Sequence, residues 1–244
     1  MKRNLKTSLI IVIFLSLFNY CNGETPVMNK SKQQEKVFKT EISLKYLLYL
    51  PNDYNSTGSS FPLIIFLHGV GERGDNLAQL KVHGIPKILE NKKDFPFVVV
   101  SPQCPKDGWW TDYTDTLKTL IDYVKAEYNI DASRVYMTGL SMGGFGTWTM
   151  AERYPDLFAA VAPVCGGGEK QLAKYIKSPV WAFHGAKDDV VSMQRSQEMV
   201  DAVKAIGGNV EFTIYPELGH NCWDVTYDNE ELYKWFLSHK NDKK

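Results

Sequence analysis

The sequence lacks the features that would direct an interpretation toward nucleic-acid, nucleotide or metal binding. It has no excess of charge, because 28 acidic residues balance 28 basic ones, so nothing points to a polyanionic partner such as nucleic acid. It contains no GxxxxGK(S/T) loop, and no GxGxxG motif opens a helical pattern, which argues against a nucleotide site. Its four cysteines show neither CxxC nor Cys/His zinc spacing. The composition is that of an ordinary globular protein, with 44% apolar and 23% charged residues. The length of 244 residues suits one large domain.

The first 23 residues have the three-part pattern of a secretory signal peptide. Three basic residues within the first six precede an apolar run over residues 9–18, which is too short for a comfortable membrane span. Small or polar residues then lead to a cleavage position after Gly23. We therefore expect a secreted or periplasmic protein with no stable membrane span after processing. Two alternatives stay open, namely an uncleaved anchor and a lipid anchor on Cys21, although the residues before Cys21 form a poor lipobox.

Beyond this leader, a polar segment gives way to a regular alternation of strand-like and helix-like patterns. Residues 24–40 are rich in Lys and Gln and predict a poorly ordered lead-in, and one catalytic domain is expected over residues 41–240. Short continuous apolar runs such as Leu63–Leu67 are typical of strands buried on both faces. The pattern predicts an α/β fold with a mostly parallel central sheet and helices on both faces. The expected strands are 42–50, 63–67, 97–100, 134–138, 159–164, 180–183 and 210–215, and the expected helices are 113–128, 141–154, 193–205 and 229–238.

A GxSxG motif, Gly139-Leu140-Ser141-Met142-Gly143, lies where a predicted strand meets a predicted helix. That context is typical of the nucleophile elbow of α/β-hydrolases, in which a serine is held on a sharp strand-to-helix turn. The glycines have a steric role, because side chains two positions before and after the serine would come too close to neighbouring backbone. The motif therefore indicates that Ser141 is a nucleophile.

A serine hydroxyl becomes a good nucleophile only when a neighbouring base takes its proton. Among the five histidines, His220 is the one that follows Ser141 in a loop after a late strand, with an acid-bearing loop before it. That earlier loop carries two adjacent carboxylates, Asp188 and Asp189. We expect Asp188 to orient the imidazole, because it lies four residues after His184 in HGxxDxxV spacing, and Asp189 is the alternative.

The reaction also needs N–H donors where negative charge develops on the substrate oxygen. One donor is expected to be the backbone N–H of Met142, directly after the nucleophile. The other should lie in the glycine-rich loop over residues 68–74, which follows the 63–67 strand. Glycines there let the main chain approach a substrate, and the N–H of Val70 is the candidate donor.

Five segments in fixed order, LHGVGERGDN, SPQCPKDGWW, GLSMGGFGTW, HGAKDD and ELGHNCWD, resemble one group of α/β-hydrolases. These are secreted carboxylesterases related to feruloyl and acetylxylan esterases, polyhydroxybutyrate depolymerases and the catalytic domains of prolyl oligopeptidases. The resemblance covers roughly residues 40–240. It implies a catalytic triad of Ser141, Asp188 and His220, oxyanion donors at Val70 and Met142, and no cofactor or metal. A plain Val in the oxyanion loop departs from the HGGG motif of many lipases.

The resemblance and the number of residues between the motifs together indicate what kind of substrate to expect. The intervals from Ser141 to Asp188 and on to His220 are too short to add a lid domain, so an open cleft is expected. Trp109, Trp110 and Trp223 adjoin the predicted site loops and could stack on a phenolic acid or a sugar, although they could equally pack the core. We hypothesise a serine carboxylesterase that releases feruloyl or acetyl groups from plant polysaccharide. The alternatives are a prolyl oligopeptidase-like peptidase and a general short-chain esterase or depolymerase. Pairing among Cys104, Cys165 and Cys222 is left open.

Overall fold

The computed structural model describes residues 32–39, 43–55, 58–92 and 94–242, so the predicted signal peptide lies outside the described residues. Within those ranges, no helix has the length and apolar character needed to cross a bilayer. The expectation of a poorly ordered lead-in is wrong for residues 33–38, which form strand β1 (Gln33–Phe38). All six of its residues pair antiparallel with β2 (Leu44–Tyr49), and Phe38 packs into the core, so tertiary pairing overrides the polar composition.

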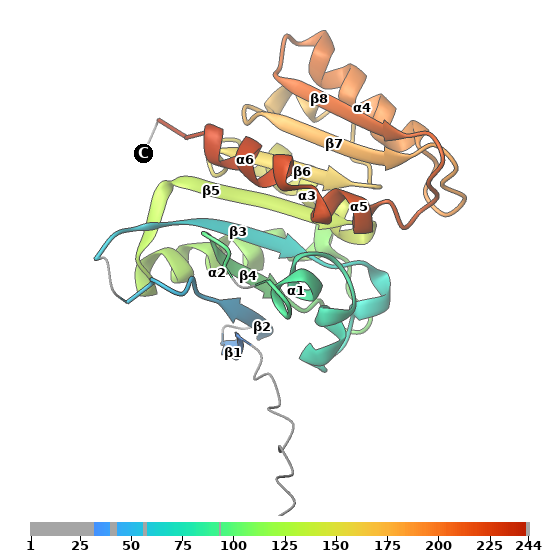
Figure 1. Ribbon diagram of the computed structural model, residues 1–244. Coiled ribbons are helices and arrows are strands. Elements are labelled where there is room, and N and C mark those ends of the chain that lie inside the picture. Colours follow the sequence, from blue (N-terminus) through green and yellow to red (C-terminus); the bar gives the residue numbers. More distant parts are fainter. Residues whose placement is uncertain (1–31, 40–42, 56–57, 93, 243–244) are drawn as a thin grey trace, which may run out of the picture. The chain divides into compact units, whose positions relative to one another are not determined.

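Eight strands form one sheet in the order β1-β2-β4-β3-β5-β6-β7-β8 (Figure 1). The pairs β1/β2 and β2/β4 are antiparallel, and the remaining pairs are parallel, which confirms the mostly parallel sheet. Every residue of β3, β4 and β6 is buried, as expected for strands covered on both faces. After β2 the strands are β3 (Phe61–Leu67), β4 (Val98–Pro102), β5 (Ile130–Leu140), β6 (Ala160–Val164), β7 (Val180–Gly185) and β8 (Val210–Tyr215).

Helices cover both faces of this sheet, as predicted, and each face has its own apolar core (Figure 1). Side chains alternate along β3, so that Leu63 and Ile65 enter one core while Ile64 and Phe66 enter the other. The first core is closed by α2 (Thr114–Glu127), α3 (Met142–Arg153) and α4 (Gln194–Ala205), and the second by α1 (Gly84–Leu89), α5 (Trp223–Asp228) and α6 (Glu230–Ser238). Four 3-10 turns complete the described elements: η1 (Val70–Glu72), η2 (Leu77–Val82), η3 (Trp110–Tyr113) and η4 (Ala173–Tyr175).

The topology determines where a site can form. In a parallel sheet the loops that leave the carboxyl ends of the strands meet along one edge, and a ligand site is expected there. The loops after β3, β5, β7 and β8 all leave that edge, because these four strands run parallel to one another through β6. Between β5 and β8 the described chain holds α3, β6, η4, β7 and α4, which are the layers of the fold itself.

Candidate active site

Ser141 occupies the single-residue turn between the end of β5 and the start of α3. Its backbone has φ 53° and ψ −117°, a conformation that L residues with side chains rarely adopt. The Ser141 N–H donates to the carbonyl of Val164 on the next strand at 3.0 Å, which ties the turn to β6. Strained non-glycine residues of this kind persist where the surrounding structure enforces them, and they cluster at functional sites.

The glycines on either side of Ser141 are required by close backbone contacts. A Cβ on Gly139 would lie 2.5 Å from the carbonyl oxygen of Gly143, and a Cβ on Gly143 would lie 2.0 Å from the carbonyl oxygen of Leu67. These distances are far shorter than any van der Waals contact between carbon and oxygen. The first turn of α3 is therefore pressed against the end of β3, and the GxSxG spacing follows from that contact.

The structure brings Ser141, His220 and Asp188 together in one line of hydrogen bonds. The Oγ of Ser141 lies 2.9 Å from Nε2 of His220, and Nδ1 of the same ring lies 2.7 Å from Oδ2 of Asp188. Asp188 lies on the loop after β7 and His220 on the loop after β8, whereas Asp189 is exposed to solvent. Nδ1 can donate to the carboxylate, which leaves Nε2 free to accept the serine proton.

The side chain of Asp188 is fully buried, and N–H donors approach both of its carboxylate oxygens. Its Oδ1 accepts hydrogen bonds from the backbone N–H groups of Val190 at 3.0 Å and Val191 at 2.8 Å. Its Oδ2 lies 3.1 Å from Nε2 of His184 in addition to the contact with His220. An ionised carboxylate has about four acceptor positions, and these contacts supply N–H donors to them. The arrangement fixes the direction from which Asp188 meets His220.

His184 acts as a buried support for that carboxylate. Burial lowers the pKa of His184 below its ordinary value, so the ring is neutral at neutral pH. Its Nε2 faces two acceptors, the carbonyl of Val191 at 2.9 Å and Oδ2 of Asp188, which places the single ring proton on Nε2. Its Nδ1 lies 2.7 Å from Oγ of Ser196, whose hydroxyl donates to the carbonyl of Gly166 at 2.9 Å.

The two predicted oxyanion donors both begin helical turns beside the nucleophile. Val70 is the first residue of η1, and Met142 is the first residue of α3, so neither N–H has a partner within its own helical turn. The loop of Val70 runs close to Ser141, because a Cβ on Gly69 would lie 3.7 Å from Cβ of Ser141. The positive end of the α3 dipole therefore lies at Ser141, and the loop that carries Val70 passes close to the same residue.

His68 supports this loop as a buried neutral ring. Its Nε2 accepts the backbone N–H of Cys104 at 2.9 Å, so its proton must be on Nδ1, which faces the carbonyl of Gly69 at 2.5 Å. Burial lowers the pKa of His68 to about 4, which agrees with a neutral ring. The carbonyl of His68 accepts from Nε1 of Trp110 at 3.0 Å.

The three predicted substrate-binding tryptophans have different environments. Trp110 is 0% exposed, so the prediction that it stacks on substrate is wrong, and its indole instead packs on Gly146 and anchors His68. Trp109 is 45% exposed on the loop that leads into η3. Trp223 is 9% exposed at the start of α5, with its ring edge-on to His220 at a centroid distance of 5.2 Å.

Two of the three cysteines whose pairing the sequence left open, Cys165 and Cys222, lie next to the site. Cys104, Cys165 and Cys222 are all buried and carry free thiols. One potential ligand atom each from Cys165, Asp188 and His220 lies within 4.8 Å of the others, a spacing that could hold a metal ion. Asp188 and His220 already bond to each other, and burial beside Cys222 raises the pKa of Cys165 well above its ordinary value. Because the carboxylate and the imidazole are already engaged with each other, we propose no metal site here.

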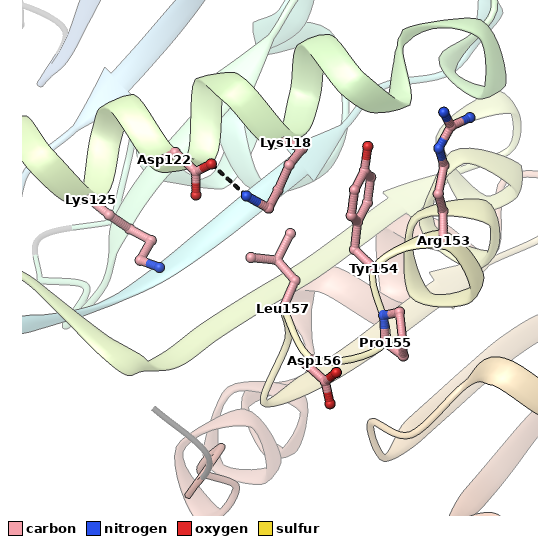
Figure 2. A pocket seen from close by; sticks show the side chains of 8 residues that line it. All are labelled: Lys118, Asp122, Lys125, Arg153, Tyr154, Pro155, Asp156 and Leu157. Carbon is pink, nitrogen blue, oxygen red and sulfur yellow. Dashed lines mark hydrogen bonds and ion pairs between the residues drawn. The ribbon is translucent and has the colours of Figure 1, made fainter.

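A separate hollow of about 310 Å³ lies between α2 and the turn after α3, shown in Figure 2. Lys118 of this hollow pairs with Asp122 at 2.5 Å, as Figure 2 shows. Arg153 pairs with Asp115 at 2.9 Å. None of the residues around this hollow belongs to the predicted site. We assign it no part in the chemistry.

Sequence reasoning missed two polar side chains beside the nucleophile loop, Glu72 and His83. Glu72 ends η1 and is only 8% exposed, and a Cβ on Gly69 would lie 3.3 Å from its Oε2. His83 lies at the start of α1, with its ring 5.4 Å from that of Trp223. The acidic residue inside the glycine-rich HGVGERG loop was the one signal in the sequence that could have indicated the first of these.

Comparisons with known proteins agree with this geometry. The family model described as "Dienelactone hydrolase family" matches residues 106–229, which hold Ser141, Asp188 and His220. The bifunctional acetylxylan esterase/xylanase XynS20E of Neocallimastix patriciarum is 34% identical over 139 residues, which cover 55% of this chain and 20% of that protein. Poly(3-hydroxyalkanoate) depolymerase C of Paucimonas lemoignei is 53% identical over 124 residues, which cover 45% of this chain and 28% of that protein.

A solved structure matches a larger share of this chain than these two relatives do. The crystal structure of a thermostable esterase superposes with a TM-score of 0.74 at 33% identity, covering 86% of this chain and 63% of the other. The chain therefore spans less than two thirds of the length of each of these relatives. Since the family model matches half of the chain, across the nucleophile turn and both partner loops, this chain belongs to the dienelactone hydrolase family and has the α/β-hydrolase fold.

Proposed function

We propose that the protein is a serine carboxylesterase that hydrolyses carboxylic esters through an acyl-enzyme intermediate. The observation that carries the proposal is the line of hydrogen bonds from Ser141 Oγ through His220 to Asp188, at 2.9 Å and 2.7 Å. A nucleophile, a base within reach of its proton, and an acid that orients the base are what acyl transfer requires. Membership of a hydrolase family with acetylxylan esterase and depolymerase relatives supports the same reaction.

In the proposed reaction, Oγ of Ser141 attacks the ester carbonyl carbon while Nε2 of His220 takes the hydroxyl proton. The carbonyl oxygen becomes an oxyanion, and the N–H groups of Met142 and Val70 donate to it. His220 then gives its proton to the departing alcohol oxygen, which breaks the ester bond and leaves the acyl group on Ser141. Water attacks this acyl-enzyme by the same route and releases the carboxylic acid. No step draws on a cofactor.

We further propose that the substrates are feruloyl or acetyl esters on plant polysaccharide, met outside the cell after residues 1–23 direct export. The names of the relatives support acetylated xylan and polyester as substrate classes. Trp109 is 45% exposed, so its ring is available for an aromatic contact with a substrate. A mature N-terminus at residue 24 in exported protein would support the leader, and retention of the apolar segment would contradict it.

The test of the reaction is labelling and turnover together. A fluorophosphonate should label Ser141, and Ser141→Ala should abolish both labelling and hydrolysis of p-nitrophenyl acetate. Hydrolysis of methyl ferulate or acetylated xylan would support the polysaccharide proposal, whereas turnover of short p-nitrophenyl esters alone would refute it. Cleavage of peptide substrates in place of esters would favour the peptidase alternative, which some structural neighbours represent as acylaminoacyl peptidases.

A further inference from the structure

The side chains of Glu72, His83 and Trp223 form a continuous polar cluster beside the nucleophile. Nε2 of His83 lies 3.9 Å from Oε1 of Glu72, and the His83 ring lies edge-on to the Trp223 ring at 5.4 Å. Trp223 in turn lies edge-on to His220 at 5.2 Å. The cluster thus begins at the oxyanion loop and ends at the proposed catalytic base.

Each of these three side chains has a buried polar atom without a hydrogen-bond partner among the described residues. The atoms are Oε2 of Glu72, Nδ1 of His83 and Nε1 of Trp223. Buried polar groups in folded proteins are nearly always satisfied, so each exception needs an explanation, of which a bound water or ligand is one. Three such atoms in adjoining side chains at one edge of a reaction site indicate a place for a polar ligand.

The carboxylate of Glu72 is the most unusual member, because its side chain is only 10% exposed. Its Oε2 lies 3.8 Å from Nδ1 of His68, but that N–H already donates to the carbonyl of Gly69, and the His68 ring is neutral. The neighbouring Arg73 directs its guanidinium to the carbonyls of Val70 and Gly108. A buried carboxylate in this position is stabilised when a donor approaches it.

The contact between Trp223 and His220 indicates which part of the ester this cluster borders. The base of an acyl-transfer reaction returns its proton to the leaving group, so the groups beside that imidazole border the alcohol part of the ester. Trp223 is such a group, since its ring contacts His220. A ligand group in the cluster would therefore belong to the alcohol, not to the acyl chain.

The donors and acceptors determine the chemistry of that group. A carboxylate only accepts hydrogen bonds and an indole N–H only donates them, whereas a hydroxyl can donate to the first and accept from the second. His83, whose side chain is 34% exposed, is the most exposed member of the cluster. Resting on the proposed esterase function, we propose that Glu72, His83 and Trp223 form a subsite for free hydroxyl groups of the alcohol, as in an ester of a sugar.

The test compares two acetate esters of six-membered rings, a methyl xyloside monoacetate and cyclohexyl acetate, which differ in free hydroxyls. Wild-type protein should have the higher kcat/KM for the sugar ester. Glu72→Met, which keeps the length of the side chain but cannot accept, should lower the ratio of the two kcat/KM values about tenfold or more, as for a lost hydrogen bond to a charged group. Trp223→Phe, which keeps a ring against His220 but has no N–H, should lower the ratio about threefold or more.

The ratio separates recognition from general damage, because a partly unfolded or misaligned enzyme loses both activities together. Glu127→Met, the same substitution on an exposed residue of α2, is the matched control and should keep the wild-type ratio. Wild-type ratios near one, or unchanged ratios in both variants, would overturn the subsite while leaving the esterase proposal intact. Failure of wild-type protein to hydrolyse either ester or to accept the phosphonate would overturn both.

Discussion

The close contact between α3 and the end of β3 allows a quantitative prediction for Gly143→Ala. The new Cβ would lie 2.0 Å from the carbonyl oxygen and 2.5 Å from the carbonyl carbon of Leu67, and 2.8 Å from the carbonyl oxygen of His68. All three atoms are backbone, so no side chain can turn away, and the turn must move by about 1 Å to restore normal contacts. Overpacking of this kind costs about 1–3 kcal/mol, which corresponds to a fall in Tm of between about 2 and 12 °C.

The same movement should affect catalysis more strongly than stability. It displaces Ser141 and the N–H of Met142 relative to His220, and a misplacement of about 1 Å can reduce turnover about a hundredfold. Hydrolysis of p-nitrophenyl acetate measures this loss, and thermal unfolding measures the destabilisation. Gly71→Ala is the steric control, since a Cβ there meets no atom within 4 Å, and it should keep the wild-type Tm. A Gly143→Ala protein with wild-type Tm and turnover would refute the steric account of the motif.

Other substitutions test the remaining features. Asp188→Asn should lower kcat roughly 10⁴-fold. The remaining oxygen must accept hydrogen bonds from the N–H groups of Val190 and Val191, so the amide NH2 would face Nδ1 of His220 and stabilise the wrong tautomer. Asp189→Asn should change p-nitrophenyl acetate hydrolysis less than about twofold. Burial raises the pKa of Glu152 from 4.5 to about 7, so folded protein holds a proton that the unfolded chain releases, and stability falls as pH rises through this window. Glu152→Gln should therefore raise Tm relative to wild type at pH 8 and not at pH 4, and a difference that is the same at both would contradict this. Trp110→Ala should cost about 3–5 kcal/mol in urea unfolding, whereas Trp109→Ala should cost less than about 1 kcal/mol.

Much of the fold was predictable because its core strands carry a strong local signal. The continuous apolar run at residues 63–67 and the alternation of apolar and polar residues at 210–215 needed only their own residues to be identified, and both are strands in the structure. The GxSxG motif combined a strand, a turn and a helix in one short segment, so the position of Ser141 could be read directly. The order of motifs along the chain then restricted the partner loops to those after the two last strands.

The features that could not be predicted depend on contacts made by distant residues. Strand β1 has a polar sequence and exists through its pairing with β2. Helices α1 and α5 have six residues each, too few for a helical periodicity to be recognised, and they are stabilised by packing against each other. Trp110 adjoins a site loop in sequence, yet its side chain turns into the core. The cluster of Glu72, His83 and Trp223 joins three separate segments, so no single motif could reveal it.

Among the described non-glycine residues, Ser141 and Cys165 have positive φ, 53° and 41° respectively. They follow neighbouring strands, so the conformational cost, about 1–3 kcal/mol each, is concentrated at the very edge where the nucleophile lies. Glycine would adopt either conformation without that cost. A laboratory selection for heat resistance alone would consequently favour Ser141→Gly, because this variant is more stable but has lost the Ser141 hydroxyl. Any such selection on this protein must therefore also measure ester hydrolysis at every round.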